Sequence, residues 1–181
     1  MRKEYAALSP LLRARLRECA AAVKSRKKSL HSIAAAVGGG DICAECRGEC
    51  CAHGKNHVTV VDILVHLSDD RQLFTPCFER ELCPYLGETG CLMEPEYRPY
   101  NCITFTCERV EGLLEPAERE RFYAVERDLR ALCEGVEQLF DNRFRYGLLM
   151  NSERDLVRNR TAVLRGAALV ENFKEECGWP R

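Results

Sequence analysis

Long apolar runs are missing from this sequence of 181 residues. No segment of eighteen apolar residues lacks a charge, and the first residues, MRKEYAALSPLLRARLREC, contain no continuous apolar stretch. A membrane-spanning helix needs about 20 apolar residues and a secretory signal an apolar centre of about 7–15, so we expect neither. We therefore expect a cytoplasmic protein with no membrane partner. In that reducing compartment metal thiolates are more common than disulfides.

A strong net charge and the common catalytic motifs are also missing. The 27 Lys and Arg residues nearly cancel the 28 Asp and Glu residues, so no global field attracts nucleic acid, and we expect no such partner. The basic run Lys24, Arg26, Lys27, Lys28 has no interleaved aromatic residues, which predicts a solvated helix face. Gly-rich cofactor loops, G-x-S-x-G and H-E-x-x-H do not occur, which favours a non-enzymatic role.

Cysteine, by contrast, is abundant. Of the 12 cysteines, eight form a first set, C-x2-C-x3-C-C, and, after 31 residues, a second set, C-x7-C-x10-C-x4-C. These eight are Cys43, Cys46, Cys50, Cys51, Cys83, Cys91, Cys102 and Cys107. So many thiols in two dense sets need a bonding partner, which is either other sulfurs or metal. We expect all eight to be metal ligands.

The spacing of the first set bears on which metal is bound. Structural zinc usually takes two C-x2-C pairs per ion, and this chain has one such pair, Cys43 and Cys46. The adjacent Cys50 and Cys51 suit one tetrahedral zinc poorly, because neighbouring side chains diverge; they suit two centres, or a cluster and a nearby thiol. Iron–sulfur clusters accept irregular spacings, so the pattern favours a cluster but leaves Zn²⁺ open.

Other donor residues are secondary candidates. His53 and His57 follow the first set closely enough to ligate, and Cys77 could replace a ligand of the second set. The remaining residues are predicted as core or tail thiols or as ordinary helix histidines: Cys19, Cys133, Cys177, His31 and His66.

The hydrophobic pattern predicts a mainly α fold, in one domain of residues 1–181, with long helices packed beside an irregular, cysteine-rich metal-binding lobe at 41–107. Ser9 and Pro10 begin a helix over 10–37, bent near Ser25 to Ser29, which Gly38 to Gly40 end. Thr59 and Asp62 form a capping box for a short helix over 60–68 that packs on the first. An apolar stripe predicts a helix over 116–142, buried against the first helix rather than paired with a second copy. We assign a strand to 146–150 and a weak helix within 152–170.

The residues around the cysteines also carry a resemblance. The order C-x2-C-x3-C-C, V-T-x-x-D, C-P-Y-L-x4-G-C-L-M-E and R-P-Y-N-C-x4-C resembles the YkgJ-type cysteine-cluster family, described as a zinc- or iron-chelating domain. The matching residues, about a third of the chain by extent, are Cys43, Cys46, Cys50, Cys51, Thr59, Asp62, Cys83, Pro84, Leu86, Gly90, Cys91, Glu94, Arg98, Pro99, Cys102 and Cys107. The resemblance implies metal binding through these cysteines. Flagellin lysine N-methylases are similar over the same domain, which makes an S-adenosylmethionine-linked protein-modifying enzyme an alternative. Two departures concern the metal surroundings: Ile103 stands where many members have Arg, and Pro95-Glu96 lengthens the approach to Arg98.

Two charged residues are expected beside the metal. Four or more thiolates on one centre leave net negative charge, which Arg98 would offset while it bonds to sulfur or pairs with Asp62. The sequence therefore predicts a metal-binding protein with an iron–sulfur cluster or zinc, in a redox or structural role and open to a protein partner. The alternatives are the enzyme above and a zinc or iron chaperone or sensor.

Overall fold

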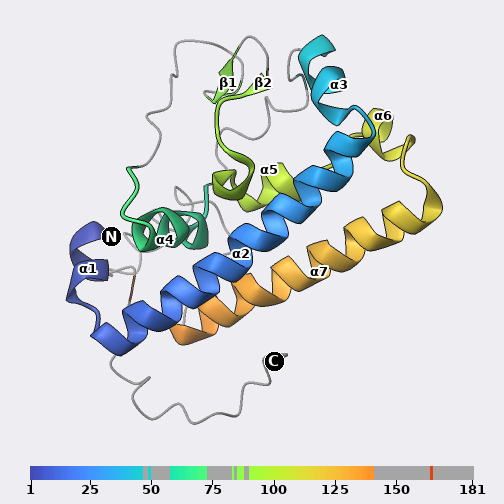
Figure 1. The fold of residues 1–181 in the computed structure, drawn as a ribbon. Helices are drawn as coiled ribbons and strands as arrows, with labels where there is room; N and C mark the ends of the chain where they lie inside the picture. Colours follow the sequence, from blue (N-terminus) through green and yellow to red (C-terminus); the bar gives the residue numbers. More distant parts are fainter. Residues whose placement is uncertain are drawn as a thin grey trace, which may run out of the picture.

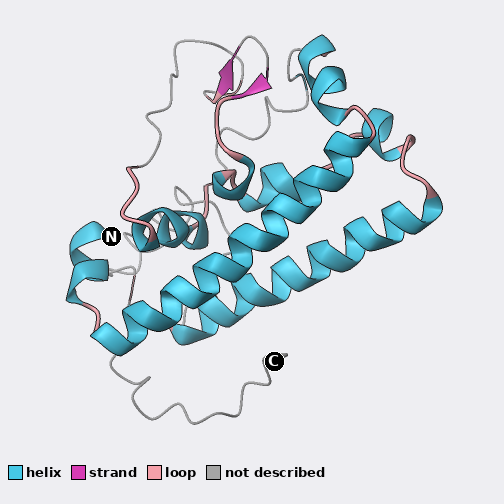
Figure 2. Cartoon of the chain, viewed as in Figure 1, coloured by secondary structure: helices cyan, strands magenta, loops and turns pink. Residues whose placement is uncertain are grey.

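The computed structural model describes residues 1–46, 49, 58–72, 83, 85–87, 90–140 and 164, and this part of the chain is mostly helical. Two long helices, α2 (Pro10–Ala36) and α7 (Pro116–Leu139), lie side by side and antiparallel (Figure 1). Shorter elements gather at the two ends of this pair. In Figure 2 the two short strands lie at the same end as the C-terminus of α2.

The long helix α2 agrees with its predicted bounds. The Ser9 hydroxyl accepts a hydrogen bond from the Leu12 N–H at 3.2 Å, and Pro10 occupies the first helical position. The helix continues without interruption through Ser25 to Ser29. It ends before Gly38, whose φ of +77° is a left-handed conformation that glycine adopts at little cost.

Helix α7 ends three residues earlier than predicted and packs along α2, as its apolar stripe indicated. Its inward residues Phe122, Leu129 and Val136 are buried. Helix α4 (Val60–Ser68) also packs on α2, and its predicted capping box is present in both directions between Thr59 and Asp62. Two apolar clusters result, one around each half of α2.

Several short elements were not predicted. Helix α1 (Arg2–Ala7) precedes α2, and the strands β1 (Leu86–Gly87) and β2 (Gly90–Cys91) pair antiparallel with Leu86 opposite Cys91. The 3-10 helix η2 (Pro95–Tyr97) and the helices α5 (Tyr100–Thr104) and α6 (Glu108–Glu111) follow. The described residues 85–87 and 90–111 therefore form a series of short strands and helices.

The prediction for the residues after Gly38 was wrong. We expected an irregular loop from Asp41, but helix α3 (Gly39–Glu45) occupies this position, so Gly39 and Gly40 begin a helix. Gly39 is buried, and a Cβ on it would lie 2.6 Å from the Ala34 carbonyl oxygen. The absence of a side chain at Gly39 therefore allows α3 to turn back closely on the end of α2.

Within the described ranges, no helix combines the length and apolarity needed to cross a membrane. The strand predicted at 146–150 lies outside the described residues, and so does the helix predicted within 152–170, apart from Leu164. Leu164 is buried in the apolar cluster around Leu12 and Phe140.

Candidate functional site: a cavity lined by cysteines

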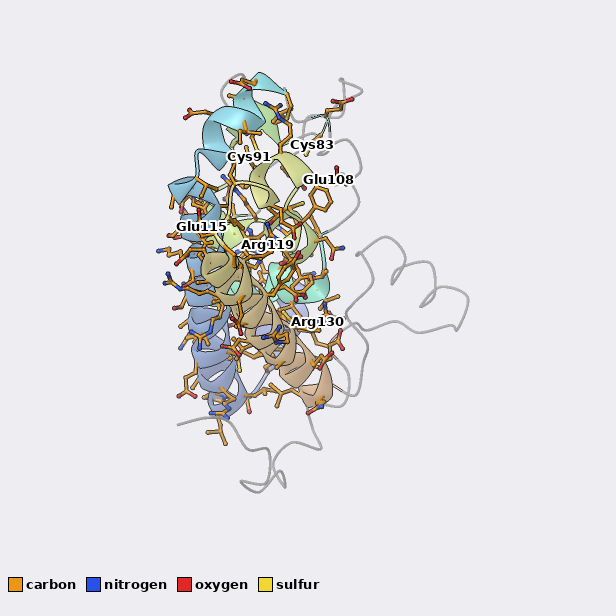
Figure 3. All side chains as sticks on the ribbon, turned by 90° about the vertical axis from the view of Figure 1, so that its right-hand side faces the viewer. Cys83, Cys91, Glu108, Glu115, Arg119 and Arg130 are labelled. Carbon is orange, nitrogen blue, oxygen red and sulfur yellow. The ribbon has the colours of Figure 1, made fainter. Side chains whose placement is uncertain are left out.

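A cavity of about 260 Å³ lies where the C-terminal part of α2 meets the short elements. Five of the eight predicted ligands line it: Cys43, Cys83, Cys91, Cys102 and Cys107. They come from α3, the start of the hairpin, β2, α5 and the residue that precedes α6. Figure 3 shows Cys83 and Cys91 at the same end of the molecule, far from Arg130 on α7. The fold thus brings together thiols that are up to 64 positions apart in the sequence (107 − 43).

Short local bonds fix the backbone that carries these thiols. The Leu86 N–H donates to the Cys83 carbonyl at 3.0 Å, and the β1–β2 pairing then returns the chain to Cys91. Cys46 ends α3, and its thiol donates to the Cys43 carbonyl with an Sγ to O distance of 3.5 Å. Helix α3, which carries Cys43, contacts both β2, which carries Cys91, and α6, which follows Cys107.

The electrostatic effects of the thiols divide them into two neighbourhoods. The pKa of Arg109 is raised, first by its hydrogen bond to Glu45 and further by the nearby thiols of Cys46 and Cys107. The pKa of Tyr85 is raised by burial first, and then by Cys83, Cys102, Asp62 and Cys91. Cys46 and Cys107 therefore lie near Arg109, and Cys83, Cys91 and Cys102 lie near Tyr85.

Arg98 provides the fixed charge of the cavity. Among the described lining residues there is no Asp or Glu, and no carboxylate in the described ranges forms an ion pair with Arg98. Its Nε–H donates to the Met93 carbonyl at 3.0 Å. The Arg98 guanidinium therefore places a positive charge at the wall of a cavity that five thiols line.

Asp62 pairs with Lys27 and not with Arg98, the partner predicted from the sequence. Its Oδ1 accepts a hydrogen bond from Lys27 Nζ at 2.7 Å, and both side chains are buried. Its Oδ2 accepts from the Thr59 N–H and hydroxyl, each at 2.8 Å, and from the Tyr100 N–H at 3.4 Å. The prediction of a solvated basic face is therefore wrong for Lys27. The other three residues of the basic run also form ion pairs: Lys24 with Asp69, Arg26 with Asp128 and Lys28 with Glu96.

The two described histidines differ in their positions. His31 lines the cavity, which sequence reasoning missed, and its pKa is lowered by burial and then by Arg98. Its place one helical turn after Lys27 was the available signal, because residues four apart share a helix face. His66 packs against Tyr97 with ring centroids 4.9 Å apart, away from the cavity lining.

Two of the residues predicted as core or tail thiols pack against the apolar clusters, Cys19 fully buried and Cys133 partly buried. Cys19 is buried in the apolar cluster around Leu12, and burial raises its pKa. Cys133 packs between the two clusters, and burial raises its pKa to about 12. Neither is available as a thiolate near neutral pH, which agrees with a packing role.

The donor set fits a thiolate-bound metal in kind, because thiolates are the ligands of zinc and of iron–sulfur clusters. In the part of the chain that the structure describes, no three His, Cys, Asp or Glu side chains lie close enough together to hold an ion. Cys50, Cys51, His53, His57, Cys77 and Cys177 lie outside the described residues. What the described residues provide is a common cavity for five thiols.

Comparison of the sequence with family models and with curated proteins, and of the structure with solved structures, finds no match. The candidate site is therefore interpreted from its own residues.

Proposed function

We propose that this protein binds metal through its eight-cysteine constellation and holds an iron–sulfur cluster or zinc. The observation that carries the proposal is the cavity itself: five of the eight thiols line one space of about 260 Å³. Thiols spread over a surface or buried singly in a core would give no such convergence. The ligand set proposed is Cys43, Cys46, Cys50, Cys51, Cys83, Cys91, Cys102 and Cys107.

The volume of the cavity favours a cluster over one ion. A water molecule takes up roughly 30 Å³ in the liquid, so the cavity exceeds the needs of a single zinc several times over. The irregular cysteine spacings favour the same choice, since clusters accept remote ligands. The sequence resemblance to the YkgJ-type family supports metal chelation without deciding between iron and zinc.

The residues around the thiols have roles that follow from their chemistry. A bound cluster would supply one-electron redox chemistry, and zinc would supply cross-links between segments too short to form a core. Arg98 would offset the negative charge that several metal-bound thiolates leave on the centre. Apolar side chains such as Leu30, Met93 and Phe122 form the remaining wall and limit the access of water to the sulfurs.

Two other functions are alternatives. An S-adenosylmethionine-linked enzyme similar to flagellin lysine N-methylases is supported by the sequence resemblance alone. The exposure of Cys91 favours a zinc or iron chaperone or sensor, because an exposed ligand exchanges more readily. Metal release kinetics and S-adenosylmethionine binding distinguish these functions from a redox or structural site.

The first test is the metal and acid-labile sulfide content of protein purified without oxygen. A brown protein with about four iron and four sulfide per chain supports a cluster, whereas colourless protein with one or two zinc ions supports a zinc site. Protein that contains neither metal, and takes up neither on reconstitution, contradicts the proposal.

Replacement of single ligands is the second test. We expect Cys43→Ser, Cys50→Ser, Cys91→Ser or Cys102→Ser to lower the metal content and the midpoint of thermal unfolding together, because metal binding energy contributes to folding. Cys19→Ser is the control, since this thiol lies in the apolar core; it should lower stability and leave metal content unchanged. Full metal content in all four ligand variants would show that the ligand assignment is wrong.

A further inference from the structure

Lys27 lies in the middle of α2 and is completely buried, with 0% of its surface exposed. Lysine is almost never buried in this way unless its charge is paired. Its ammonium group binds two acceptors from distant parts of the chain: Asp62 Oδ1 at 2.7 Å and the Arg98 carbonyl oxygen at 2.6 Å. One cation thus connects α2 with the start of α4 and with the segment that precedes α5.

Asp62 connects the same segments from the opposite side. Besides Lys27 and the two donors of Thr59, it accepts the Tyr100 N–H at 3.4 Å. The pair therefore binds the chain on both sides of Pro99: Lys27 holds the carbonyl group before this proline, and Asp62 holds the amide group after it. Pro99 is itself fully buried, so the segment has little freedom to move between these two bonds.

The clamped segment carries two residues of the candidate site. Arg98 lines the cavity one position before Pro99, and the Cys102 N–H donates to the Pro99 carbonyl at 3.0 Å, which fixes the first turn of α5. Both side chains would lose their positions at the cavity wall if the segment moved away from α2. Two other lysines of α2 also form ion pairs, Lys24 with Asp69 and Lys28 with Glu96, and each binds a side-chain carboxylate rather than the backbone at Arg98.

We propose that the buried Lys27–Asp62 pair is a positioning device for the cysteine cavity, which holds Arg98 and Cys102 in the place where they face the other thiols. Lys27 is the residue that the sequence motifs do not include. The geometric part of this inference stands on the described contacts, and its consequence for metal binding rests on the proposed function. Lys27 acts through the backbone of Arg98.

The test measures how fast each cysteine of the reduced, metal-free full chain reacts with iodoacetamide, resolved by mass spectrometry. In Lys27→Met and Asp62→Asn we expect Cys102 to react about tenfold faster than in the wild type, because its segment opens locally. Cys19 is buried in the core and reports global unfolding, so the faster reaction of Cys102 counts as local opening only where it exceeds the rise at Cys19; an equal rise at both thiols would contradict the proposal. Lys28→Met is the matched control on the same helix; its pair with Glu96 is partly exposed, and it should leave Cys102 protected.

The double variant Lys27→Met/Asp62→Asn separates positioning from stability. Each single change leaves one buried charge unpaired, which is strongly destabilising, whereas the double change removes both charges. We expect the unfolding midpoint to recover towards that of the wild type while Cys102 stays reactive, because the Arg98 carbonyl has lost its donor. Restored protection of Cys102 in the double variant would overturn the proposal and leave the pair a purely stabilising one.

A metal probe links this result to the site. With Co²⁺ added to reduced protein, we expect the thiolate-to-cobalt absorption of the wild type to be altered in shape in Lys27→Met and unaltered in Lys28→Met. An identical spectrum in all three proteins would refute the consequence for the metal site. A wild type that binds neither Co²⁺ nor iron would refute the proposed function, and the alkylation rates would still decide the geometric part.

Discussion

Replacement of Thr59 by Val tests the hydrogen bonds that begin α4. The Thr59 hydroxyl accepts from the Asp62 N–H at 3.2 Å and donates to Asp62 Oδ2 at 2.8 Å. Val has nearly the same shape, so the change removes these two bonds and little packing. The lost cap is worth about 1 kcal/mol and a hydrogen bond to a charged acceptor about 2, which together predict a loss of about 3 kcal/mol.

Thr59→Ser is the matched control, because it keeps the hydroxyl and removes one buried methyl group, at a cost of about 0.8 kcal/mol. Urea unfolding at pH 7, followed by far-ultraviolet circular dichroism, measures both free energies. A loss of about 3 kcal/mol corresponds to a fall of roughly 6–12 °C in the melting temperature of a protein this size. Equal losses in the Val and Ser variants would refute the claim that the hydroxyl supports Asp62.

Two further changes test other parts of the structure. His66 is buried, and burial lowers its pKa from 6.5, so below about pH 6.5 the unfolded chain takes up a proton that the folded chain does not. Stability should therefore fall as pH drops from 7.5 to 5.5, and His66→Gln should weaken this pH dependence of the free energy of unfolding in urea. An unchanged pH dependence in the variant would contradict the role of His66 and would assign the effect to His31, whose pKa is also lowered. Gly39→Ala should destabilise the protein in thermal unfolding, because its Cβ would meet the Ala34 carbonyl oxygen at 2.6 Å. Gly40→Ala has open space and should be neutral or stabilising by up to about 1 kcal/mol, so equal midpoints for the two would show that α3 does not pack as described.

The long elements could be predicted because their signals are local and repeated. Ser9-Pro10 begins α2, Thr59 and Asp62 begin α4, and the apolar stripe of α7 extends over most of its length. Each signal depends on residues within one or two turns of the helix, so a single sequence contains all the information needed.

The short helices were missed for the opposite reason. Helices of four to seven residues, such as α3, α5 and α6, are unstable alone, and packing against the rest of the protein decides whether they form. In α3 the deciding feature is the close approach of Gly39 to Ala34, which a glycine-rich sequence before a cysteine does not reveal. The same applies to the β1–β2 hairpin, which has two residues in each strand.

The candidate site could be predicted in its composition but not in its connections. The spacing of the cysteines identified the thiols, and five of them line one cavity. Asp62 was predicted to pair with Arg98, because several thiolates on one centre leave negative charge that an arginine nearby would offset. The actual partner, Lys27, lies 35 positions earlier, on a helix whose distance from Asp62 depends on the tertiary fold.

Lys27 nevertheless had a signal in the sequence. It stands four residues after Val23 and three before Leu30, both fully buried, so it occupies the apolar stripe of α2 and not its solvated face. We predicted a solvated position for Lys27 from the basic run, in spite of this periodicity, because burying an ammonium group without a partner costs several kcal/mol. A methionine at this position, combined with a neutral residue at position 62, would pack α2 against α4 without that cost, but it could not bind the Arg98 carbonyl. The charge at Lys27 is therefore explained by the backbone it holds beside the cysteines, rather than by the stability it adds to the core.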